Sequence, residues 1–183
     1  VASTPPTLVI GPALLSEPHR PLRPVLFLRA LKILKGHVAS FARTAPIELW
    51  PLVAAFLQSF SPQWQPQGVD PNKLQDYRNR LQRSMPGGLS NDASVLALEV
   101  IASLGNRAST LQTASNAWGN RCALLALGDM SIALSSIAAA AGVAGGPPAG
   151  GPERLTWVGR NAEARDLVIY SVSDAFFEAR ARG

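Results

Sequence analysis

Hydrophobic residues recur at intervals of three and four along most of this chain, which is the spacing that places them on one face of an α-helix. The clearest case lies over residues 24–44, where the cations Arg29, Lys32 and Lys35 fall between the apolar positions. We therefore expect a helix over this range, with the three cations on its solvent-facing side.

The same spacing, together with start and stop residues, predicts the remaining helices. Pro46 suits the first turn of a helix, Asp70 followed by a proline is a typical helix start, and Gly128 followed by Asp129 ends one helix and caps the next. In the helix expected over residues 91–104, Val95 and Leu98 should face the core. The further helices are expected over residues 46–60, 71–85, 91–104, 108–127, 129–141, 162–171 and 173–182.

Two stretches break the helical pattern. Residues 5–11 form a short β-prone run between prolines and a glycine, so they are the single candidate for a strand. Residues 142–152 read GVAGGPPAGGP, a composition typical of a flexible linker or loop. The sequence thus predicts a mainly α fold, a single-domain helical bundle of about six to eight helices over residues 1–183, with at most a short N-terminal strand.

Composition agrees with a folded domain of this kind. Of the 183 residues, 47% are hydrophobic and 16% are charged, which is enough apolar material for a core and excludes a disordered tail. The single cysteine, Cys122, excludes a scaffold held by internal disulfides and fits a reducing compartment, so we expect a cytoplasmic protein. The apolar stretch 122–143 contains Asp129, whose carboxylate opposes membrane insertion, and is interpreted as a buried helix pair.

The charge balance adds a candidate surface. The formal net charge is +5, and arginine supplies fourteen of the seventeen cations. A second basic group, formed by Arg78, Arg80 and Arg83, lies on the helix expected over residues 71–85. Such residues suit phosphate, an acidic protein or an anionic membrane surface, although an ordinary solvated helix face has the same composition.

The usual signatures of chemistry are absent from the sequence. It has no HExxH or CxxC metal motif, no GxSxG nucleophile motif and no glycine-rich phosphate loop. His19, His37 and Cys122 are scattered without ligand spacing, and an apolar surrounding disfavours a reactive thiolate at Cys122. We therefore expect no catalytic residues, no metal and no cofactor.

One constellation stands out in the middle of the chain, at residues 117–129. Arg121, preceded by Asn120, is expected near the start of a buried apolar helix, and Asp129 lies at its end. Buried charges require partners, so two readings stay open. Either the polar groups meet partners inside the fold, or Arg121 reaches solvent and Asp129 caps the following helix.

At these residues the chain resembles the C-terminal conserved region of large tetratricopeptide-repeat proteins of myxobacteria and their relatives. That region carries a pattern similar to NRAGLLLCGD, and residues 120–129 read NRCALLALGD, with the cysteine at a different place. The LVIG opening at residues 8–11 and the ending DLVIYSVSDAFFEAR at residues 166–180 resemble it as well. The resemblance implies a metallopeptidase-like helical scaffold without the metal site, and an assembly or scaffolding role.

The sequence therefore predicts a non-enzymatic protein–protein interaction or scaffolding module of a larger assembly, with a protein partner or a second copy of the chain as its ligand. The alternative is nucleic-acid or anionic-surface binding through the arginine-rich helical face. An enzyme whose site is assembled from distant residues is a third possibility.

Overall fold

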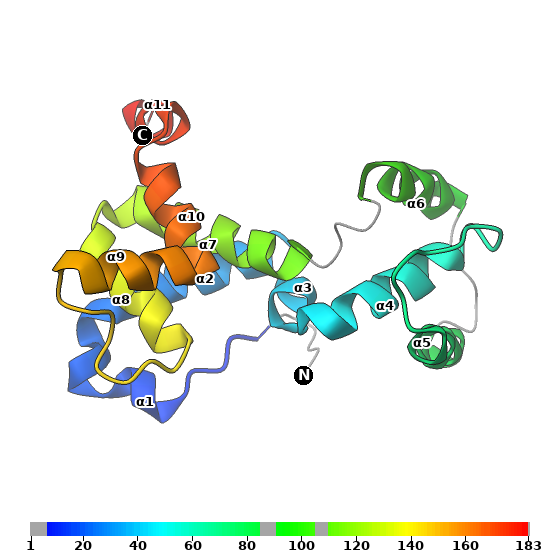
Figure 1. Ribbon diagram of the computed structural model, residues 1–183, viewed down its shortest axis with the longest axis horizontal. Helices are drawn as coiled ribbons and strands as arrows, with labels where there is room; N and C mark the ends of the chain where they lie inside the picture. The colour runs from blue at the N-terminus through cyan, green and yellow to red at the C-terminus, as the bar shows by residue number, and fades with distance from the viewer. Residues whose placement is uncertain (1–6, 85–90, 105–109, 183) are drawn as a thin grey trace. The chain divides into compact units, whose positions relative to one another are not determined.

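A computed structural model describes residues 7–84, 91–104 and 110–182, and helix accounts for 76% of the described residues. The predicted mainly α class is confirmed, with more helices than the expected six to eight (Figure 1). Residues 8–10, where a strand was considered, are irregular and exposed, and no strand occurs in the described ranges. The elements are α1 (Pro12–Leu15), the 3-10 helix η1 (Glu17–Leu22), α2 (Arg23–Lys35), α3 (Ala39–Arg43), α4 (Pro46–Gln58), α5 (Pro71–Ser84), α6 (Asn91–Leu104), α7 (Leu111–Leu127), α8 (Met130–Ala140), α9 (Gly151–Arg160), α10 (Ala162–Ser171) and α11 (Asp174–Ala181).

The chain divides into two compact units, one formed by Val1–Ala42 and Thr113–Gly183 and the other by Arg43–Gln112. The expected single domain over residues 1–183 remains a prediction. Within the described part of the chain, no helix is long and apolar enough to cross a membrane.

The helix expected over residues 24–44 is interrupted in its second half. α2 ends at Lys35, and His37 adopts a left-handed conformation with φ of 56°. The amide of Val38 donates to the carbonyl of Ile33 at 3.2 Å, and the amide of His37 donates to the carbonyl of Leu34 at 3.0 Å. This pair of hydrogen bonds is a Schellman motif, which ends a helix and redirects the chain.

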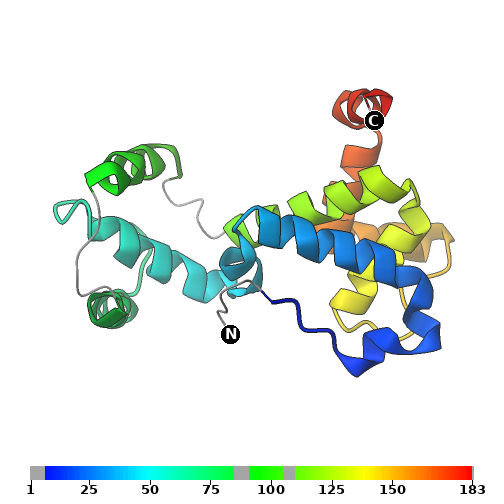
Figure 2. The same cartoon turned by 180° about the vertical axis from the view of Figure 1, so that it is seen from behind.

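α2 and α7 lie side by side in the first unit (Figure 1 and Figure 2). They meet at Gly119, where an added Cβ would come within 3.0 Å of Cγ of Arg29. The ring of Trp118 covers Gly36 so closely that a Cβ there would lie 2.1 Å from it. Two glycines therefore permit the close approach of these helices.

The core of this unit is formed by α7, α8, α10 and α11. Small residues such as Ala133 and Ala164 lie fully buried there beside larger ones, which lets the helices pack closely. Phe176 is 8% exposed, whereas Phe177 is 60% exposed. The C-terminal helices therefore pack onto the core with one of the two phenylalanines inward. The buried core residues are Leu124, Ala133, Leu134, Ile137, Ala164, Leu167 and Phe176.

Most of the linker or loop predicted at residues 142–152 coincides with an irregular segment, which gives way to a helix at Gly151. α8 ends in a second Schellman motif, with the amide of Val143 donating to the carbonyl of Ala138 and Gly142 at φ of 71°. The chain is irregular from there to Gly150, and α9 begins at Gly151. The helical pattern of residues 151–160 was not predicted, because α9 begins within the run of glycines and prolines.

In the second unit, α4 contributes the buried side chains and α5 packs beside it. Trp50 donates from Nε1 to the carbonyl of Gln67 at 2.9 Å, and its ring meets that of Trp64 edge to face at 6.0 Å. Ile47, which belongs to the apolar stripe of the sequence, is 72% exposed. The inward face of α4 is instead formed by Leu49, Trp50, Pro51, Val53, Ala54, Ala55, Leu57 and Gln58.

Candidate interaction surface

α6 exposes a row of large aliphatic side chains in the second unit. Val95 and Leu96 are each 62% exposed, Leu98 is 53% exposed and Val100 is 40% exposed. They lie within two turns of α6 and are spread around its exposed side, with the exposed Glu99 among them. We call these four residues the α6 surface.

The expectation that Val95 and Leu98 face the core is wrong, and the reason lies in the packing of α6. The helix contacts α4, and Ala97, at 4% exposed, is the buried residue among its described side chains. A helix with apolar residues on more than one side can turn only one of them toward its neighbour. Here the side with the small alanine is inward, so the larger side chains stay outside.

The basic face expected on α2 is largely engaged inside the fold. Arg29 pairs with Glu163 of α10 through Nη2 and Oε2 at 3.2 Å, and its side chain is 14% exposed. Lys32 lies over the ring of Trp118, with Nζ 4.1 Å from the ring centroid. Only Lys35 is exposed as expected, because the face assigned to solvent is the one that meets α7 and α10.

The second basic group lies on α5. Arg78, Arg80 and Arg83 are all exposed, as the sequence predicts. Arg80 is held by its own helix, since Nη2 lies 2.7 Å from Oδ2 of Asp76 and the guanidinium lies over the ring of Tyr77. This leaves Arg78 and Arg83 as the more available cations of this helix.

The polar motif of α7 finds partners on α10. Asn120, 2% exposed, donates from Nδ2 to Oε2 of Glu163 at 2.9 Å, so Glu163 accepts from Asn120 and Arg29 together. Arg121 binds Asp166 with two hydrogen bonds, the one from Nε measuring 2.9 Å. The hydrogen bonds with Asp166 raise the pKa of Arg121, because they favour its charged form.

Asp129 caps α8, and its Oδ1 accepts from the amide of Ile132 at 2.9 Å. Of the alternatives left open by the sequence, Asp129 therefore caps the following helix, whereas Arg121 meets a partner inside the fold. The sequence analysis did not assign Glu163 and Asp166. Their spacing of three residues on one predicted helix is the signal that places both carboxylates on one face.

A further polar cluster, not assigned from the sequence, joins α4 to α5. Oε1 of Glu48 lies 2.5 Å from Nζ of Lys73, and Oε2 accepts from the Tyr77 hydroxyl at 2.7 Å. Hydrogen bonds from Lys73 and then Tyr77 lower the pKa of Glu48, and the hydrogen bond to Glu48 raises the pKa of Tyr77. The cluster holds the two helices together.

The residues considered for metal binding or nucleophilic chemistry are dispersed. Cys122 is half-buried and has no disulfide partner, and Nδ1 of His19 lies 3.0 Å from Oγ of Ser16. His37 is exposed at the end of α2. In the described ranges, no three His, Cys, Asp or Glu residues come together in a group that could hold a metal ion.

Comparison of the chain with protein-family models, curated proteins and solved structures gives no match.

Proposed function

We propose that this chain is a non-enzymatic module that binds another polypeptide within a larger assembly, and that the α6 surface is where it binds. The observation that carries this proposal is the exposure of four neighbouring large aliphatic side chains on one helix. Contiguous apolar patches are uncommon on isolated soluble proteins and mark interaction sites. Leu96 and Leu98 are 62% and 53% exposed, so their burial on binding would contribute about 1–2 kcal/mol each.

The polar residues support a structural rather than a catalytic role. Asn120, Arg121 and Asp129 are engaged with Glu163, Asp166 and the start of α8, respectively. Groups that are fully used in this way stabilise the fold. The resemblance of residues 120–129 to the C-terminal region of tetratricopeptide-repeat proteins, and a cytoplasmic location, remain part of this proposal.

Nucleic-acid or anionic-surface binding is the second candidate. Its support is the exposure of Arg78 and Arg83 on α5 and of Lys35 on α2. It is weakened because Arg29 and Lys32 are directed to Glu163 and Trp118. The polypeptide proposal is therefore preferred.

Site-specific photo-crosslinking in the native cell tests the location of the surface. A benzoylphenylalanine replaces Leu98 in one variant and Leu155, an equally apolar residue of α9 that is 75% exposed, in a control variant. We expect one discrete protein adduct from position 98 and none from position 155. Adducts with nucleic acid, equal adducts at both positions, or no adduct from position 98 would contradict the proposal.

A further inference from the structure

A cavity of about 850 Å³ lies within the first unit, between η1, α8, the irregular segment after α8, and α9. Its volume is within the range of sites that bind small organic molecules. Slightly more than half of its lining surface is apolar, including that of Leu22, Ile132, Val143 and Pro147. Such a lining favours a ligand with an apolar body.

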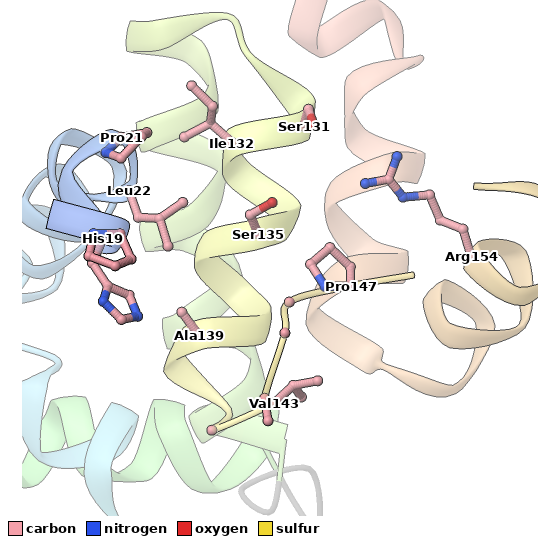
Figure 3. A pocket seen from close by; sticks show the side chains of 15 residues that line it. His19, Pro21, Leu22, Ser131, Ile132, Ser135, Ala139, Val143, Pro147 and Arg154 are labelled. Atoms are coloured by element: carbon pink, nitrogen blue, oxygen red, sulfur yellow. The ribbon is translucent and has the colours of Figure 1, made fainter. Parts of the chain in front are cut away.

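Four polar side chains interrupt this apolar lining: His19, Ser131, Ser135 and Arg154. Figure 3 shows the side chain of Arg154 extending from α9 toward α8, with the hydroxyls of Ser131 and Ser135 turned toward the same side of α8 as Arg154. Arg154 and the two serines thus lie on one side of the cavity, whereas His19 lies on η1 at the other side, beside Pro21 and Leu22.

Arg154 has an unmet requirement in this position. Its Nε is buried and has no hydrogen-bond partner, although a buried polar atom is normally paired. No carboxylate belongs to the lining residues that the structure describes, so nothing there neutralises the guanidinium. An anion entering the cavity would supply the missing acceptor.

The two serines differ from their neighbour on the same helix. Ser136 donates from Oγ to the carbonyl of Ile132 at 2.8 Å, which is the ordinary way for a helical serine to satisfy its hydroxyl. In the described part of the chain, Ser131 and Ser135 make no such bond, and both line the cavity. Their hydroxyls are therefore available as donors beside Arg154.

We propose that this cavity is a binding site for a small organic carboxylate with an apolar body. Its carboxylate pairs with Arg154 and accepts from Ser131 and Ser135, and its apolar body lies along Leu22 and Ile132. The site is independent of the α6 surface, because all of its lining belongs to the first unit.

Isothermal titration calorimetry with octanoate tests the proposal on the intact chain. Octan-1-ol has the same apolar chain without the charge, and inorganic phosphate has charge without the chain. Arg154→Gln removes the cation from the cavity. Arg160→Gln is the matched control, because Arg160 is an exposed arginine of the same helix outside the lining.

We expect octanoate to bind the wild-type protein and the Arg160→Gln variant equally, and to bind the Arg154→Gln variant at least tenfold more weakly. Octanol and phosphate should each bind the wild type at least tenfold more weakly than octanoate. In ¹H–¹⁵N spectra, octanoate should shift the amides of Ser131 and Ser135. Three results would overturn the proposal: equal affinity of the wild type for octanol and octanoate, unchanged affinity for octanoate after Arg154→Gln, or no octanoate binding at millimolar concentration. The comparison of octanoate with octanol uses the wild-type protein, so it remains a test even if a variant does not fold.

Discussion

Phe176 is expected to anchor the C-terminal helices, and replacing it tests the packing of the first unit. Its side chain is 8% exposed within the core cluster, and its ring meets that of Tyr170 edge to face at 5.6 Å. A buried aromatic side chain removes about 150–200 Å² from water, which at roughly 25 cal/mol per Å² amounts to about 4–5 kcal/mol. The denatured chain already buries part of that area, so we expect Phe176→Ala to lower the free energy of unfolding by about 3–4 kcal/mol.

Phe177→Ala is a matched control, because Phe177 is the adjacent residue of the same type but is 60% exposed. Its replacement should cost less than about 1 kcal/mol. Urea unfolding followed by circular dichroism gives both values, and hydrogen exchange of the α10 amides reports whether the C-terminal helices have detached. The packing described for α11 is refuted if the two variants lose equal stability, or if Phe176→Ala stays within 1 kcal/mol of the wild type.

Three further predictions concern single side chains. His37→Gly should raise the free energy of unfolding by about 0.5–1 kcal/mol, because glycine adopts the left-handed conformation without steric cost; a lower urea midpoint would contradict this. Arg29→Glu should lower the free energy of unfolding by about 2 kcal/mol, because it places a second carboxylate beside Glu163. Lys35→Glu, on the exposed side of α2, should change it by less than about 0.5 kcal/mol. Similar urea midpoints for the two variants would show that the Arg29 face of α2 is solvated. Because the pKa of Glu48 is lowered in the folded protein, its ionised carboxylate stabilises the fold above the ordinary pKa, and this contribution is lost as the pH falls through the pKa of the folded state. Tyr77→Phe removes one hydrogen bond to Glu48 and should raise the pKa of Glu48 toward 4.5 in a carboxyl NMR titration. An unchanged pKa would refute the role of the hydroxyl.

Much of the helical architecture follows from local sequence. Periodicity and capping residues predict the two C-terminal helices and the glycine and aspartate between α7 and α8. These features depend on residues close together in the sequence, so the spacing of hydrophobic and capping residues predicts them directly. The missed α9 and the interruption at His37 depend on backbone conformations at single positions, which hydrophobic spacing does not record.

The candidate surfaces were harder to predict, because they depend on which side of a helix meets its neighbour. Leu98 was placed in the core and Arg29 in solvent, and the structure reverses both. Periodicity gives the two sides of a helix but not the partner. Arg29 faces the interior because it pairs with the carboxylate of Glu163, more than a hundred residues further along the chain. α6 turns the side with the small Ala97 toward its neighbour, which leaves the larger side chains exposed.

The most direct test of the central claim is the affinity of the protein crosslinked at position 98 for purified variants of this chain. Since burial of each leucine contributes about 1–2 kcal/mol, Leu96→Ser together with Leu98→Ser should weaken binding by at least tenfold. Arg78→Gln together with Arg83→Gln should leave the affinity within twofold, with little dependence on salt between 50 and 500 mM. An affinity that survives the leucine replacements but falls with the arginine replacements and with salt would contradict the account and favour the anionic ligand.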